Sequence, residues 1–68
     1  MTKEQFKMIL NFNGDVAAYI DHEHIWASAS LSTCFDIETL CKQFGFKIIG
    51  KYKDFENEGY YDLLIKKV

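Results

Sequence analysis

The stretch that decides the fold is residues 33–68, TCFDIETLCKQFGFKIIGKYKDFENEGYYDLLIKKV. Its first part carries apolar residues at the i, i+3, i+4 and i+7 spacing of one helix face: Ile37, Leu40, Cys41 and Phe44. Thr33 is the predicted N-cap, and Asp36 is the alternative start. Gly45 follows the last periodic residue, where a left-handed residue commonly ends a helix. The pattern therefore predicts one main helix over about 34–44.

After that glycine the apolar pattern becomes typical of strands. Residues 46–53 and 59–67 are rich in isoleucine, tyrosine, phenylalanine and leucine, and the polar segment 54–58 separates them. Two such runs around a short polar turn predict an antiparallel hairpin. Gly50 in mid-strand indicates a bulge or a close backbone approach. The face of the last strand that we expect to be buried carries Tyr61, Leu63 and Ile65.

Residues 6–12 fit two structures. Phe6, Met8, Leu10 and Phe12 occupy alternate positions, which favours a strand, and Asn13-Gly14 behind them is typical of a hairpin turn. The alternative is a helix over 2–12, because Thr2 and Gln5 have the spacing of a capping box. We predict the strand.

Residues 15–21 and 25–31 are the next two predicted strands, joined by a polar turn at 21–24. The predicted order is β-β-β-α-β-β, or α-β-β-α-β-β if 2–12 is helical. Either order gives a single small two-layer α+β domain over residues 1–68, in which one main helix packs on an antiparallel-rich sheet.

The composition narrows the class of protein. The 68 residues are 49% apolar and 16% aromatic, which is enough for a core and too apolar for a disordered chain. No segment approaches the ~20 apolar residues that a membrane-spanning helix needs. The first residues lack an apolar signal region. Two cysteines do not form a disulfide framework. We therefore expect a cytoplasmic protein in a reducing compartment, without membrane contact.

The charge pattern disfavours nucleic-acid binding. The formal net charge is −2, and the chain has no arginine, the usual residue for bidentate phosphate and guanine contacts. Lysine is nevertheless concentrated in residues 41–68, with six lysines against four acidic residues. A nucleic-acid surface stays open as an alternative, with Tyr52 and Tyr60 stacking on bases. Its lysines would be Lys42, Lys47, Lys51, Lys53, Lys66 and Lys67.

Few residues are candidates for chemistry. His22 and His24 with Cys34 and Cys41 could in principle make a four-ligand zinc site, but the cysteine spacing matches no common zinc module. The same residues allow a Cys-His nucleophile pair, supported only by the position of Cys34 near a helix N-terminus. The glycines are scattered singly and form no phosphate-binding loop. We predict no catalytic residues, no metal and no cofactor, and hence a protein that is not an enzyme; a metal or thiol site is the alternative.

One local resemblance extends over residues 40–52 and 59–65. It lies in a helix that ends in a Gly-Phe pair and leads into a hairpin whose last strand carries Tyr, Asp and apolar residues. This unit resembles the end of many acetyl-CoA-dependent N-acetyltransferases. It covers less than half of the chain, and the family's pyrophosphate-binding loop has no counterpart here. The resemblance therefore implies a shared supersecondary unit and assigns no catalytic residue.

Aromatic residues carry the functional prediction. Eleven aromatics are many for a core of this size, and a single helix covers only one face of a sheet. Exposed tyrosine and tryptophan are typical anchors of protein interfaces, and acidic turns can steer a basic partner. The predicted partner-binding residues are Tyr19, Trp26, Tyr52, Phe55, Glu56, Glu58 and Tyr60.

From these residues we predict a non-enzymatic module that binds a larger host protein or complex and regulates or inhibits it. A homodimer, or a second helix over the same face, would also account for the surplus aromatics. The Lys-, Ile-, Phe- and Asn-rich composition without arginine or proline fits an AT-rich genome. By analogy, such a small free-standing domain would be an accessory, anti-defence protein of a phage or mobile element.

Overall fold

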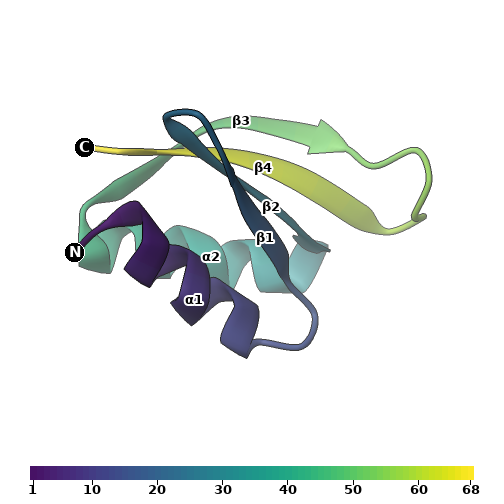
Figure 1. Ribbon diagram of the computed structural model, residues 1–68. Coiled ribbons are helices and arrows are strands. Elements are labelled where there is room, and N and C mark those ends of the chain that lie inside the picture. Colours follow the sequence, from purple (N-terminus) through teal and green to yellow (C-terminus); the bar gives the residue numbers. More distant parts are fainter.

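Two helices and four strands follow one another along residues 1–68 of the computed structural model (Figure 1). The observed order is α-β-β-α-β-β, the second of the two predicted, and the α+β class is confirmed. The elements are α1 (Lys3–Phe12), β1 (Ala17–Asp21), β2 (His24–Ser30), α2 (Leu31–Phe44), β3 (Phe46–Lys53) and β4 (Tyr60–Lys67).

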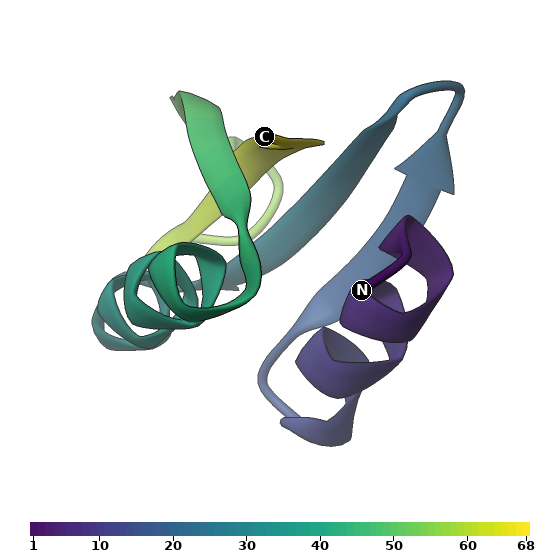
Figure 2. The same ribbon diagram turned by 90° about the vertical axis from the view of Figure 1, so that its left-hand side faces the viewer.

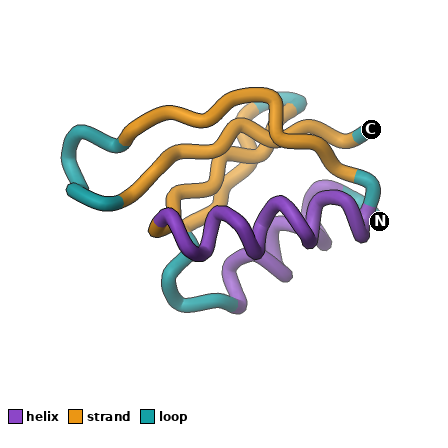
Figure 3. The backbone as a smooth tube through the Cα atoms, turned by 180° about the vertical axis from the view of Figure 1, so that it is seen from behind, coloured by secondary structure: helices purple, strands orange, loops and turns teal.

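The four strands form one antiparallel sheet in the order β1-β2-β4-β3. Both helices lie on the same face of this sheet, with α1 under β1 and α2 under β3 and β4 (Figures 1 and 2). The chain ends lie at one end of the molecule, seen from behind in Figure 3. The second helix thus shares the face of the first, and the other face of the sheet is left uncovered by the chain.

The predicted strand over 6–12 is wrong, because this segment is the helix α1. Its N-terminus is a capping box: the Gln5 amide nitrogen donates to Thr2 Oγ1 at 3.1 Å, and the Thr2 nitrogen donates to Gln5 Oε1 at 2.8 Å. The helix buries Phe6 and Leu10 and leaves Met8 and Phe12 exposed. A strand would have put all four side chains on one face, whereas the helix needs to bury only the pair at i and i+4.

Asn13-Gly14 is correspondingly not a hairpin turn but the link from α1 to β1. The Asp15 nitrogen donates to Asn13 Oδ1 and the Val16 nitrogen donates to the Asn13 carbonyl, both at 3.0 Å. Strand β1 therefore begins at Ala17, two residues later than predicted. The predicted turn at 21–24 is confirmed as the connection between β1 and β2.

Helix α2 begins at Leu31, before the predicted caps Thr33 and Asp36. Ser30 is the N-cap, yet its side chain accepts no capping bond; its hydroxyl donates to Asp15 Oδ2 at 2.6 Å. The predicted C-terminus is confirmed, since Gly45 has φ +80° in the left-handed region. The predicted apolar stripe is also confirmed; it faces the core with Ile37, Leu40, Cys41 and Phe44.

The predicted hairpin over β3 and β4 is confirmed. The register shifts between Ile48 and Gly50, which is the bulge that the mid-strand glycine indicated. In the turn, Asp54 Oδ1 accepts hydrogen bonds from the Glu56 nitrogen at 2.9 Å and the Asn57 nitrogen at 3.3 Å. Hydrogen bonding, from the Asn57 side chain above all, lowers the pKa of Asp54.

The core lies between the sheet and the helices. The Phe6 and Phe46 rings stack with centroids 4.2 Å apart and planes 8° apart, and the Phe44 ring lies 6.1 Å from Phe6, so both helices meet around one aromatic cluster. Ala27 and Ala29 on β2 are fully buried beneath the helices. Neither helix is both long and apolar enough to cross a lipid bilayer.

Candidate functional site: the open face of the sheet

The open face, defined as the sheet face turned away from both helices, is built by strand alternation. On β2 the side chains of Ile25, Ala27 and Ala29 are buried toward the helices, so Trp26 projects to the other side. Cross-strand neighbours in register share a face. One row across the open face is therefore formed by Tyr19, Trp26, Leu64 and Gly50, in that order from β1 to β3.

Trp26 and Tyr52 form the centre of this face. Their ring centroids are 5.9 Å apart at an angle of 43°, a favourable tilted aromatic arrangement. Gly50 makes this possible, since a Cβ there would lie 2.7 Å from the Tyr52 hydroxyl oxygen and 2.8 Å from Cε2. The Tyr52 ring thus lies over Gly50 of its own strand and contacts Trp26. Tyr52 remains 52% exposed and Tyr19 59% exposed, so both rings are available to a partner.

A polar group lies within this aromatic surface. Asp62 is in register with Ser28 on one side and Tyr52 on the other. Tyr19, Trp26, Ser28 and Asp62 line a shallow cleft of about 240 Å³. An aromatic cleft whose lining includes one carboxylate suits a partner side chain that carries a hydrogen-bond donor.

Tyr60 is held in place by a network that the sequence did not reveal. Its hydroxyl donates to Asp15 Oδ1 at 2.6 Å, and the Ser30 hydroxyl donates to Asp15 Oδ2 at 2.6 Å. The hydrogen bonds from Ser30, Tyr60 and Thr33 hold the pKa of Asp15 well below its usual range, and the bond to Asp15 raises the pKa of Tyr60. Because Asp15 and Tyr60 are 45 positions apart, no local pattern pairs them.

The remaining predicted residues lie apart from the sheet, in the loop between β3 and β4. Phe55 is 94% exposed, and Glu56 and Glu58 are exposed beside it. The predicted partner-binding set therefore divides into a sheet group (Tyr19, Trp26, Tyr52, Tyr60) and this loop group. The structure also exposes aromatic and apolar side chains on the helices that sequence reasoning missed; they are Met8, Phe12, Leu31 and Phe35.

The lysines of the nucleic-acid alternative are divided among several surfaces. Lys47 and Lys66 are cross-strand neighbours on the open face. Lys51 and Lys53 are in register with Leu63 and Tyr61, on the helix side of the sheet, and Lys42 belongs to α2. Lys67 is in register with the buried Phe46, so only two of the six share a face with Tyr52.

The metal and thiol alternative is not supported by the geometry. His22 lies in the turn after β1 and His24 begins β2, whereas Cys34 and Cys41 are buried free thiols of α2. Nowhere do three or more His, Cys, Asp or Glu side chains come together as a metal site would require. Burial raises the pKa of Cys34, and raises that of Cys41 to about 11, so both thiols stay protonated and poorly nucleophilic at neutral pH.

The fold and this site define a small two-layer α+β domain with an aromatic, uncovered sheet face. Comparisons with models of protein families, with curated proteins and with solved structures find no match for the chain. The helix-glycine-hairpin unit is present, but no family model, that of the N-acetyltransferases included, matches the chain.

Proposed function

We propose that this protein is a non-enzymatic binding module that presents the open face of its sheet to a larger protein and thereby regulates or inhibits it. The observation that carries the proposal is the Trp26–Tyr52 pair, with Tyr19 beside it, on a face that neither helix covers. Tyrosine and tryptophan on a rigid surface contribute large contact areas at low entropic cost, which is why they dominate interface hot spots.

The surroundings of the aromatic pair favour a protein partner. Lys47 and Lys66 are neighbours on the open face, while Asp62 adjoins Tyr52 within it. Glu56 and Glu58 extend from the β3–β4 loop. Charges of both signs around an apolar centre are typical of a protein interface, with its apolar core and polar rim.

A nucleic-acid ligand is the second candidate, and the pairing of Lys47 and Lys66 on the same face as Tyr52 favours it. The carboxylate of Asp62 in register with Tyr52 opposes it, because a phosphate backbone along this row would meet a like charge. Titration with a single-stranded oligothymidylate at two salt concentrations separates the candidates. Binding that weakens steeply with salt would replace a protein partner with a nucleic acid.

We further propose a cytoplasmic setting, in which the buried thiols of Cys34 and Cys41 remain reduced. The partner would be a host protein, and the chain an accessory protein of a phage or mobile element. The assignment to a phage or mobile element is supported only by the composition of the chain.

The test is affinity capture from a lysate of the native host, with Trp26→Ala and Tyr52→Ala compared against the unaltered protein. Phe12→Ala is the matched control, since it removes an aromatic side chain that is 89% exposed on α1. We expect both sheet variants to lose the captured protein and the control to retain it. Retention by both sheet variants would exclude the open face as the binding surface.

Two further variants refine the test. Glu56→Gln with Glu58→Gln removes charge from the loop group, and reduced capture at low salt would assign it a steering role. Sedimentation of the protein alone tests self-association: a dimer that Trp26→Ala dissociates would mean that a second copy covers the open face.

A further inference from the structure

The two edges of the sheet differ in how they are protected. β1 is one edge, and the Asn11 side chain occupies it: Nδ2 donates to the Ala18 carbonyl at 3.0 Å, and Oδ1 accepts from the Ala18 nitrogen at 2.7 Å. This amide satisfies Ala18 much as a residue of a neighbouring strand would. The Asn11 amide therefore blocks strand pairing at Ala18, on an edge that is only five residues long.

β3 is the other edge, and nothing in the chain covers it. No side chain hydrogen-bonds to its backbone, and its only strand partner is β4. Alternate residues of an edge strand direct their amide and carbonyl groups outward, so β3 offers unpaired hydrogen-bonding groups along eight residues.

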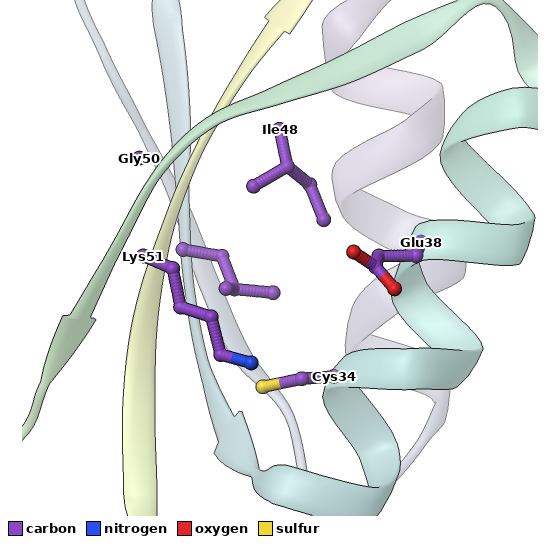
Figure 4. Close-up of a pocket in the computed structure, with 6 residues that line it drawn as sticks. Cys34, Glu38, Ile48, Gly50 and Lys51 are labelled. Atoms are coloured by element: carbon purple, nitrogen blue, oxygen red, sulfur yellow. The ribbon is translucent and has the colours of Figure 1, made fainter.

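A groove runs beside this edge, between β3 and α2 (Figure 4). One cleft of about 280 Å³ lies among Cys34, Glu38, Ile48, Gly50, Lys51 and Leu63. A second, of about 170 Å³, lies among Glu38, Cys41, Lys42, Phe46, Lys47 and Ile48. The clefts share Glu38 and Ile48, so they lie end to end along the strand.

The charge of the edge is positive although the chain as a whole is acidic. β3 contains Lys47, Lys51 and Lys53 and no acidic residue, in a protein of formal net charge −2. Lys51 points into the groove toward α2 (Figure 4). Its Nζ lies 5.1 Å from the centroid of the Tyr61 ring. Glu38 is the one acidic residue that lines the clefts.

We propose that the β3 edge is a docking site for an extended acidic segment of a partner protein, which adds as a fifth strand and places alternate side chains in the groove along α2. Main-chain pairing to an edge strand supplies affinity, and pockets for alternate side chains supply specificity. A second copy of this chain fits poorly, because two β3 edges would bring lysines against lysines and the short β1 edge is blocked at Ala18 by Asn11.

This inference rests on the proposed function as a protein-binding module and names the partner's chemistry. It concerns a different surface from the open face. The lysines and the bulge of β3 also discourage indiscriminate strand pairing. An acidic segment would overcome the repulsion from the lysines, because its charge is opposite to theirs.

The test begins with a library of random ten-residue peptides displayed on phage and selected on the intact protein. We expect selected peptides to carry Asp or Glu at every second position. Synthetic copies should shift the NMR signals of β3 amides and protect them from hydrogen exchange. Copies N-methylated at alternate amides, which cannot pair with a strand edge, should lose binding.

Charge-reversed variants locate the contact. Lys51→Glu with Lys53→Glu should weaken the peptide roughly tenfold, as expected for two exposed ion pairs turned repulsive. Lys3→Glu with Lys7→Glu makes the same change in net charge on α1 and should have a much smaller effect.

Three results would overturn the inference. The first is that the selected peptides show no Asp or Glu at every second position. The second is that the N-methylated peptide binds as tightly as the unmodified one. The third is that oligothymidylate displaces the labelled peptide as effectively as the unlabelled peptide does. Failure here is distinguishable from failure of the proposed function. Suppose that Trp26→Ala loses the host partner, the Lys51 and Lys53 reversals keep it, and no acidic peptide is selected. The open face is then supported as the binding surface, and the docking site at the β3 edge is refuted.

Discussion

Replacing Gly50 with alanine tests whether this glycine holds the centre of the open face together. The added Cβ would lie 2.7 Å from the Tyr52 hydroxyl oxygen, 2.8 Å from Cε2 and 3.0 Å from Cζ, well inside the 3.4–4 Å of ordinary contact. The φ angle of Gly50 is not positive, so the backbone accepts alanine. The Tyr52 ring is the movable group, and we expect it to swing away from Trp26.

The free energies involved nearly cancel. Separating the Trp26–Tyr52 pair costs about 0.5–1.5 kcal/mol. Alanine in place of glycine recovers about 0.4–1 kcal/mol by restricting the unfolded chain. The net change in the free energy of unfolding should stay within about 1 kcal/mol, or a shift in Tm of at most roughly 4–8 °C. The fold should therefore survive while the site changes.

Trp26 is the only tryptophan, so its fluorescence and near-ultraviolet circular dichroism report directly on this pair. We expect Gly50→Ala to change both signals in the direction of Tyr52→Ala and to reduce capture of the partner. Gly14→Ala is the matched control, because a Cβ added at Gly14 would have no atom within 4 Å and the φ angle there is not positive. The reasoning is refuted if Gly50→Ala leaves the tryptophan signals unchanged while Tyr52→Ala alters them.

Three further outcomes are expected. Phe6→Ala should cost about 3–5 kcal/mol, nearly the whole stability of so small a domain, and chemical denaturation will measure the loss; a loss under about 1 kcal/mol would contradict the stacked core. Because its pKa is depressed, ionised Asp15 contributes fully to the stability of the fold above pH 3.8, and this contribution declines as the pH falls further. Asp15→Asn should therefore be less stable than the unaltered protein at pH 7 and lose less stability on acidification. If the two proteins lose the same stability between pH 7 and low pH, the hydrogen-bond network around Asp15 is contradicted. Cys34 and Cys41 should react with a thiol reagent only after unfolding, and fast labelling of the native protein would show that burial does not protect them.

The second half of the chain was predictable because its signals are local. The stripe from Ile37 to Phe44, the glycine at φ +80° and the two strand runs lie within a few residues of the contacts that they specify. The bulge at Gly50 followed from the same short range. The start of α2 was misplaced because its N-cap, Ser30, makes no side-chain capping bond and instead donates to Asp15, a residue from another segment.

The first helix shows where local pattern fails. Phe6, Met8, Leu10 and Phe12 alternate as a strand would, while Thr2 and Gln5 signal a helix start. Tertiary packing decides between strand and helix here, since the stack of Phe6 on Phe46 brings together residues 40 positions apart. No window around Phe6 contains that contact.

The same division holds for function. The order of the predicted helix and strands indicated a small α+β domain, and the composition indicated more aromatic residues than its core requires. Only the tertiary structure decided that both helices share one face, that β2 pairs with β4, and that β3 is left as the unprotected edge. Those outcomes depend on contacts between distant segments, and such contacts form only when the whole chain closes around a common core.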